Sequence, residues 1–269
     1  MQNIIQLFAR FGTQITFLLF MVISFSLIIK FNNSQRSIFL NSSSYYASKI
    51  DSKANEWQGY LSLQEVNDSL SRQNAELLER FINLSSDIEV VDDTTRHYQL
   101  IPARVIRSTY HLRNNHLTID KGTKDGVERD MGVLTEKGLL GIVRNVSDNF
   151  AHIVSVLNSQ IKISATVSPY AYPGNLVWKD MDPKRMFLES IPKHIDIAVG
   201  DTILTNGYST IFPEGIEIGT VESYDVDRGS SDYNITVLLA GNVPNAKVGY
   251  VIVNNMKEEQ LAIEKIDNE

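Results

Sequence analysis

Several short patterns in the 269-residue chain carry residue types that perform nucleophilic chemistry in other proteins. Ser159 and Lys162 form a Ser-x-x-Lys tetrad, Ser190 and Lys193 form a second, and residues 147–149 read Ser-Asp-Asn. Together these patterns imitate a penicillin-binding active site, in which a serine nucleophile lies beside a lysine. Their order along the chain is wrong, however, and the sequence contains no Lys-Thr-Gly. We therefore predict no catalytic serine and expect a protein that is not an enzyme.

Two further patterns could bind metal ions. His116 and Asp120 match half of a zinc peptidoglycan endopeptidase signature, but none of the five histidines supplies the His-x-His pair that would complete the ligands. Residues 225–232 resemble part of a calcium loop but lack its closing bidentate glutamate. The sequence also contains no phosphate-binding loop and no dinucleotide fingerprint. We predict no metal site and no cofactor.

The composition narrows the classes of function. The chain is 43% hydrophobic and 21% charged, which favours a folded protein over a disordered one. It has no cysteine, which excludes disulfide scaffolds and thiolate metal sites. Its formal net charge of -7 argues against a nucleic-acid partner, because phosphates are bound by clustered Lys and Arg.

The first thirty residues suggest a membrane anchor. Residues 11–29 lie between Arg10 and Lys30 and contain no charge and no proline. As a helix they would rise about 28 Å, close to the thickness of a bilayer's hydrocarbon core. We predict a short leader over 1–10 and an uncleaved transmembrane helix over 11–31. A cleaved signal peptide and a buried soluble helix are the alternatives, and the flanking charges leave the orientation open.

A heptad pattern occupies the segment 32–97, which we expect to be a juxtamembrane stretch and a coiled coil. Leucine recurs every seven residues at the d positions, and two of the four a positions are asparagine. The d positions are Leu63, Leu70, Leu77 and Leu84, and the a positions are Tyr60, Asn67, Asn74 and Phe81. Such a pattern predicts a parallel homodimer, because a buried asparagine is best satisfied by its partner helix. The alternative is an amphipathic helix that lies on its own globular domain.

From residue 98 onward the chain is rich in short β-branched runs separated by turn signals, which is typical of β-sandwiches and barrels. Residues 121–143 and 199–221 look alike: each has a Gly/Asp turn, a short strand that ends in Thr, and a strand interrupted by Gly. We therefore expect a mainly β body with two small β-barrel domains, over 98–175 and 176–256. A charged tail over 257–269 would follow.

Particular motifs in this body resemble the rod shape-determining protein MreC family. Residues 102–106 (Pro-Ala-Arg-Val-Ile) look like its entry strand, and residues 121–127 (Lys-Gly-Thr-Lys-Asp-Gly-Val) look like its first turn. The most specific match runs from residue 200 to 221, although Asn206 stands where the family usually has serine. Its motif residues are Gly200, Asp201, Thr205, Gly207, Phe212, Pro213, Gly215 and Gly219.

The resemblance has implications for the location, the assembly and the partners of the protein that its composition and residue spacing do not give. It implies two β-barrels on the outer side of the bacterial inner membrane, the first of which can be assembled from discontinuous segments. It implies a homodimer, with filaments through the barrels as an option, and a scaffold of the cell-wall elongation complex. The expected partners are MreD, MreB, RodA and a class B penicillin-binding transpeptidase, and the amino terminus would lie inside the cell.

Two other functions fit parts of the pattern. A periplasmic adaptor of an export pump also has an anchor, helices and β modules, but it would need two coiled-coil segments where this sequence has one. A cell-wall hydrolase would need metal ligands or a nucleophile that the sequence lacks. A scaffold that organises peptidoglycan synthases is therefore the expected function.

Overall fold

The computed structural model describes residues 2–31, 63–84, 97–179, 181–226 and 229–266. The chain forms two compact units, Met1–Asn67 and Asp68–Glu269. In the first unit, helix α1 spans Gln2–Phe31. Across the described parts of the chain, no helix combines the length and the apolarity that crossing a membrane requires.

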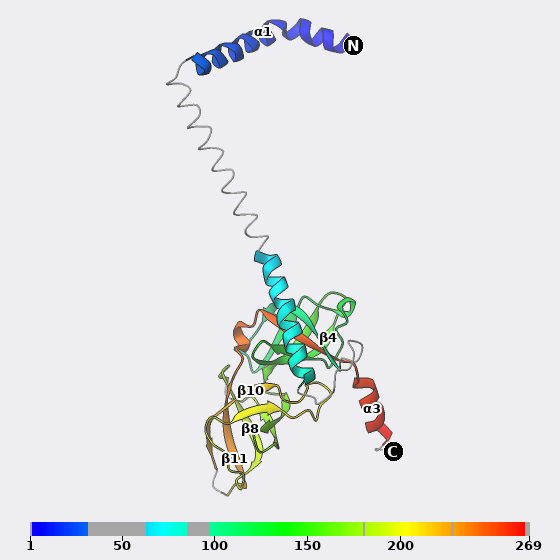
Figure 1. Ribbon diagram of the computed structural model, residues 1–269, viewed down its shortest axis with the longest axis vertical. Helices are drawn as coiled ribbons and strands as arrows, with labels where there is room; N and C mark the ends of the chain where they lie inside the picture. The colour runs from blue at the N-terminus through cyan, green and yellow to red at the C-terminus, as the bar shows by residue number, and fades with distance from the viewer. Residues whose placement is uncertain (1, 32–62, 85–96, 180, 227–228, 267–269) are drawn as a thin grey trace. The chain divides into compact units, whose positions relative to one another are not determined.

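The first of two closed barrels in the second unit has six strands, all paired antiparallel (Figure 1). In the order in which they pair, the strands are β1 (Tyr98–Ser108), β12 (Val248–Asn254), β3 (Gly132–Thr135), β4 (Gly138–Val146), β5 (Ala151–Asn158) and β2 (Asn114–Ile119). Strand β1 serves two neighbours: residues 98–104 pair with β12, and residues 105–108 pair with β2 after a register shift. The shift allows one long strand to turn a corner of the barrel.

The second barrel also has six antiparallel strands. They pair in the order β10 (Glu217–Asp225), β11 (Asp232–Leu239), β8 (Arg185–Pro192), β7 (Tyr172–Val177), β6 (Lys162–Val167) and β9 (Thr202–Thr205). Alternate side chains along β8 and β11 are buried, as expected for strands with one face toward a core. Trp178 is 1% exposed at the end of β7, and its Nε1 donates a hydrogen bond to the carbonyl of Asp182.

The bounds expected for the two barrels differ from those observed, although a discontinuous first barrel was among the expectations. The predicted boundary after residue 175 falls inside β7, which pairs with β6 and β8 in the second barrel. Strand β12, expected in the second domain, instead closes the first barrel against β1. The chain therefore leaves the first barrel after β5, builds the whole second barrel, and returns through the short helix η2 (Val243–Asn245).

Two helices accompany the barrels. The described residues 63–84 form a helix, within the segment predicted as a coiled coil. At the other end, helix α3 spans Lys257–Ile266, where a charged tail was predicted. Its first turn contains Glu258 and Glu259, whose negative charges favour a helix amino terminus.

Candidate functional site

Residues of the patterns that imitate catalytic sites make structural contacts within the first barrel. The Ser159 hydroxyl donates a hydrogen bond to Oδ1 of Asn114, and the Ser147 hydroxyl donates to the carbonyl of Phe150. His116 stacks on His152 with ring centroids 4.8 Å apart, whereas Asp120 binds Arg104. Among the described residues, no group of three His, Asp or Glu side chains could hold a metal ion.

The helix over residues 63–84 has two unlike faces. One face carries the heptad leucines in exposed positions, together with Phe81 at 59% exposure. The exposed fractions are 66% for Leu63, 53% for Leu70, 63% for Leu77 and 74% for Leu84. Burying a leucine side chain yields about 1.5–3 kcal/mol, so a stripe of four is a strong candidate for contact with another helix. We call these five residues the heptad face.

The opposite face lies against the first barrel. Ala75 and Ile82 are 4% and 2% exposed there and belong to the common hydrophobic core. Asn74, predicted at an a position of a coiled coil, is exposed and also hydrogen-bonds the Tyr250 side chain on β12. Burial raises the pKa of Tyr250, and this hydrogen bond opposes the rise. Asn67 is exposed, and Tyr60 lies outside the described residues.

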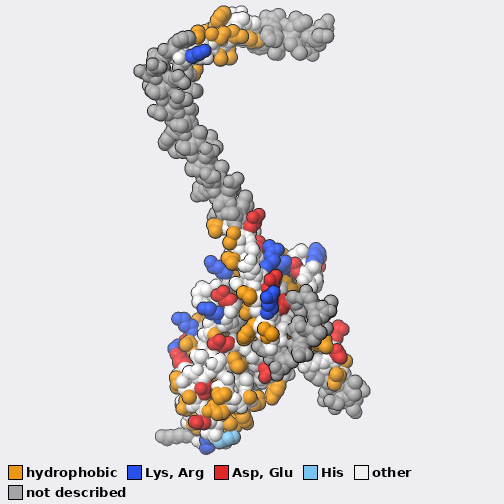
Figure 2. All heavy atoms as spheres, in the orientation of Figure 1, with side chains coloured by type: hydrophobic (Ala, Val, Ile, Leu, Met, Phe, Trp, Pro, Cys, Tyr) orange, Lys and Arg blue, Asp and Glu red, His pale blue; other side chains and the backbone are white. Residues whose placement is uncertain are grey.

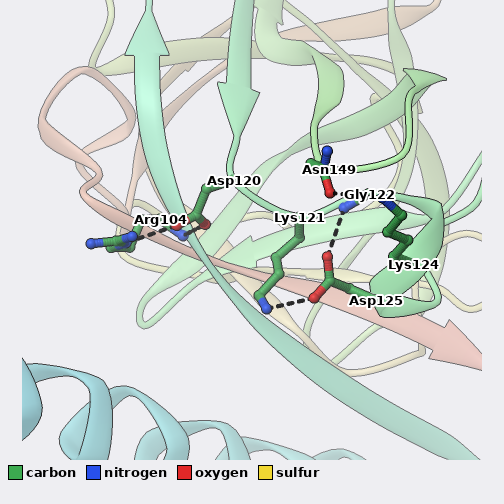
Figure 3. A network of polar contacts seen from close by, with 7 residues as sticks. All are labelled: Arg104, Asp120, Lys121, Gly122, Lys124, Asp125 and Asn149. Atoms are coloured by element: carbon green, nitrogen blue, oxygen red, sulfur yellow. Dashed lines mark hydrogen bonds and ion pairs between the residues drawn. The ribbon is translucent and has the colours of Figure 1, made fainter.

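The first family-like turn, residues 121–127, is built around Asp125 (Figure 3). Its carboxylate accepts a hydrogen bond from the Lys121 ammonium at 2.6 Å and another from the Gly122 N–H at 3.1 Å. These bonds, that of Lys121 foremost, lower the pKa of Asp125. A Cβ on Gly122 would lie 2.3 Å from the carbonyl oxygen of Ser147, so only glycine fits. This turn therefore fixes two loops of the first barrel against each other.

Thr205 organises the motif of the second barrel. Its hydroxyl donates a hydrogen bond to the carbonyl of Pro213 at 2.5 Å and accepts one from the N–H of Ile216 at 2.9 Å. Asp201 similarly closes its own turn by accepting the N–H of Ala198. Gly200, Gly207 and Gly215 have φ values of 97°, 67° and 83°, which side chains other than glycine rarely adopt. These motif residues therefore shape the strand ends around β9 and β10.

Phe212 links the motif to the first barrel. Its side chain is 5% exposed, and a Cβ built on Gly132 of β3 would lie 2.7 Å from its ring. The same Cβ would lie 2.5 Å from the carbonyl oxygen of Ile211. Asn254 at the end of β12 also donates a hydrogen bond to the carbonyl of Thr210. The loop over residues 210–212 thus packs against two strands of the first barrel.

An aromatic cluster lies at the end of the second barrel away from the first. The rings of Tyr172 and His194 meet edge to face with centroids 6.4 Å apart, and those of Tyr224 and Tyr233 with centroids 5.3 Å apart. Figure 2 shows hydrophobic and histidine side chains together at the lower end of the molecule. Exposed apolar residues next to the strand ends at this side of the barrel include Tyr170 (47% exposed), Val199 (66%) and Val226 (43%). We call these seven residues the aromatic end.

The sequence analysis did not identify the aromatic end. Its residues come from the β6–β7 turn, the start of β7, the segment after β8, the turn before β9, the end of β10 with the residue after it, and the start of β11. Closure of the barrel brings these segments together. Because they are far apart in the sequence, no local residue spacing could have predicted that they meet. An exposed aromatic cluster is typical of protein interfaces, in which Tyr and Trp contribute much of the binding energy.

Comparison with known proteins supports a family assignment. The family described as "Rod shape-determining protein MreC, barrel core" matches residues 105–254. The cell shape-determining protein MreC of Listeria monocytogenes is 30% identical over 162 residues, which cover 59% of this chain and 55% of that protein. Its counterpart in Bacillus subtilis is 33% identical over 152 residues, which cover 52% of this chain and 51% of that protein.

Solved structures show the same fold. A structure of MreC from Listeria monocytogenes aligns with a TM-score of 0.55 and 25% identity, covering 71% of this chain and 91% of that one. The crystal structure of MreC from Pseudomonas aeruginosa aligns with a TM-score of 0.54 and 22% identity, covering 57% and 98%. The chain spans about half the length of the curated relatives that it matches. Because the barrel-core match covers more than half of its residues, the chain belongs to the rod shape-determining protein MreC family.

Proposed function

We propose that the chain is a non-catalytic scaffold of the cell-wall elongation complex, which maintains rod shape by organising peptidoglycan synthases. The match of the family's barrel core to residues 105–254 is the observation that carries this proposal. The two closed barrels are compatible with this role, because their loops and strand faces can serve as docking surfaces. The role is to hold partners at fixed positions.

Dimerisation through the heptad face gives the scaffold two copies of every surface. The leucines of this face are exposed in a single chain, and their seven-residue period suits a parallel two-stranded coiled coil. Two linked copies raise the effective concentration of each partner site, so weak contacts become useful.

Helix α1 is proposed to hold the scaffold at the inner membrane, with the barrels on its outer side. Its described side chains from Phe17 to Ile28 include many exposed apolar residues, among them Phe20 at 69% and Met21 at 62%. Such a surface is unfavourable in water and suits lipid. Membrane fractionation of the full chain, with alkaline and detergent extraction, tests this part of the proposal. Release by alkali would contradict it.

The expected partners are MreD, MreB, RodA and a class B penicillin-binding transpeptidase. For the transpeptidase we propose the aromatic end as the docking surface. It combines rigid aromatic rings with exposed aliphatic side chains, which is the composition of interface hot spots. The other named partners are expected from family membership, and we assign them no surface.

Depletion of the protein in its native host tests the proposed function directly. Cell shape and the sites of new wall insertion would be imaged together as the protein is lost. The proposal predicts that cells become round and that insertion disperses over the surface. Unchanged shape together with unchanged insertion would overturn it.

Docking at the aromatic end has its own test. Replacing Tyr224→Ser and Val199→Ser should weaken co-purification of the transpeptidase by tenfold or more, since hot-spot truncations cost about 2 kcal/mol or more. Tyr208→Ser is the matched control, because Tyr208 is 74% exposed but follows the opposite end of β9. Equal losses in both variants would exclude the aromatic end as the specific site.

A further inference from the structure

Among the strands that the structure describes, none covers one edge of the first half of β1. Along residues 98–104 the strand pairs with β12, while β2 pairs only from residue 105 onward. Backbone groups of alternate residues point to the same edge of a strand, so residues 98, 100, 102 and 104 face away from β12. An edge of this kind normally presents unpaired N–H and C=O groups.

Side chains take the place of the missing strand. The Asn83 amide pairs with Tyr98 in both directions: Oδ1 accepts the Tyr98 N–H at 3.1 Å, and Nδ2 donates to the Tyr98 carbonyl at 3.0 Å. Two residues further along, the Glu79 carboxylate accepts the Leu100 N–H at 3.2 Å. Asn83 therefore makes the two hydrogen bonds that a neighbouring strand would make, and Glu79 makes a third.

The rest of the edge follows the same alternation. Pro102 has no N–H to satisfy, and a cleft of about 300 Å³ lies beside it, between the barrel and the helix residues Asp68, Ser71 and Arg72. At Arg104 the Asp120 carboxylate accepts the backbone N–H at 2.7 Å, and the Asp120 N–H donates to the Arg104 carbonyl. Figure 3 shows Asp120 directed at Arg104. The helix thus covers the edge over residues 98–100, and Asp120 covers it where β2 ends.

Both helix residues are buried for this purpose. Glu79 is 8% exposed and Asn83 is 5% exposed, although both belong to residue types that normally lie at the surface. Asn83 also donates to the Glu79 carbonyl at 2.8 Å, one helical turn away. Buried polar groups of this kind tolerate one geometry only, since a displaced partner would leave them unsatisfied.

The position of the two residues on the helix sets the direction of the heptad face. At 100° per residue, Glu79 and Asn83 project about 200° and about 240° around the helix from Leu77. The heptad face therefore points away from the barrel when both side chains are engaged. A second helix can then pack on the heptad face without disturbing the contacts to β1.

We propose that Glu79 and Asn83 are positioning residues that lock the helix to the first barrel by substituting for a strand at the β1 edge. The lock fixes the rotation of the helix and so determines where a dimer through the heptad face would place each barrel. All contacts of the lock lie within one chain. It deepens the proposed scaffold function but can be tested without a dimer or a partner.

Amide hydrogen exchange tests the lock at its own atoms. In the full chain in detergent, Glu79→Ala should speed exchange of the Leu100 amide, and Asn83→Ala that of Tyr98, by roughly tenfold. Asn83→Asp keeps the acceptor for the Tyr98 N–H, so this variant should preserve the protection of the Tyr98 amide. It is the variant to measure if Asn83→Ala folds poorly. Glu76→Ala is the control, because Glu76 lies on the same helix and is exposed. Exchange rates equal to those of this control would overturn the proposal.

A distance measurement tests the rotational consequence. Because the chain has no cysteine, spin labels can be placed at Gln73→Cys on the helix and Glu136→Cys in the β3–β4 turn, both exposed. With labelled chains diluted in unlabelled ones, the intact lock should give one narrow distance distribution. Adding Asn83→Ala and Glu79→Ala should broaden it, and an unchanged distribution would contradict the lock. Failure of the heptad face to dimerise would leave both results unaffected.

Discussion

Gly219 and Gly200 belong to one motif of the second barrel but meet different constraints. A Cβ on Gly219 would lie 2.1 Å from the carbonyl oxygen of Leu238 on the neighbouring strand, and the backbone of a paired strand cannot move away. A Cβ on Gly200 would meet nothing within 4 Å, but its φ of 97° disfavours a side chain. Gly219 is therefore required because a side chain has no space, and Gly200 because of its backbone conformation.

Two alanine variants separate these constraints. We expect Gly219→Ala to lower the free energy of unfolding by about 3 kcal/mol or more, because it forces two strands apart. Gly200→Ala should cost only about 1 kcal/mol, since it strains one exposed turn. Urea unfolding of both variants measures the difference. Equal losses would show that the spacing of β10 and β11 is not limited by Gly219.

His152 gives the first barrel a dependence on pH. Burial, and next the neighbouring His116, lower the pKa of His152 in the folded chain, so the fold favours the neutral ring. The unfolded chain binds the proton more readily, and stability is therefore lost as the pH falls through the ordinary histidine value of about 6.5. His152→Gln should reduce the loss of stability between about pH 7.5 and about pH 5.5. Urea midpoints of the two proteins at both pH values test this, and parallel losses would refute it.

At the scale of elements, the sequence predicted strands with a regular hydrophobic pattern better than strands whose pattern is interrupted. Runs such as 116–119 and 153–156 lie within β2 and β5, since alternation of buried and exposed residues is a local property. Strand β7 was not predicted, because Pro173 and Gly174 interrupt its pattern. The strand tolerates Pro173, although a Pro-Gly pair usually signals a turn.

The heptad pattern predicted only one face of the helix over residues 63–84. The heptad correctly predicted a helix, and its leucines lie on one exposed face. The same period could not reveal the opposite face, where Glu79 and Asn83 are buried against β1. Polar residues opposite a leucine stripe normally face water, and here tertiary hydrogen bonds reverse that preference.

The heptad face makes a prediction at this scale. Leu70→Ser with Leu77→Ser should convert a dimer into a monomer, because the two leucines lose their burial on association. Light scattering of the detergent-solubilised chain measures the mass, and circular dichroism checks that the barrels remain folded. Gln73→Ser with Arg80→Ser is the control, since both residues are exposed on the same helix. A double-leucine variant that stays dimeric would show that another surface makes the main contact.

For the whole molecule, the sequence patterns predicted two barrels and the family resemblance allowed a discontinuous first barrel, but no local pattern identified β12 as its closing strand. Strand β12 closes the first barrel by pairing with β1 about 150 residues earlier in the chain, and local patterns carry no information on such a return. One consequence is that the chain crosses between the barrels twice, after β5 and after β11. The loop that holds Phe212 adds a further contact between the barrels, against β3.

Gly132 is the residue at which this packing can be tested. Its backbone is outside the left-handed region, and valine suits a strand, so a substitution there need not harm the first barrel by itself. The cost arises from the second barrel, because the new Cβ would lie 2.5 Å from the Ile211 carbonyl oxygen and 2.7 Å from the Phe212 ring. Gly132→Val should therefore change the arrangement of the two barrels while each remains folded. Small-angle scattering should show the change, and Glu136→Val in the adjoining exposed turn should not. If the scattering of Gly132→Val matches that of the unsubstituted chain, the contact of Phe212 with β3 does not set the arrangement of the barrels.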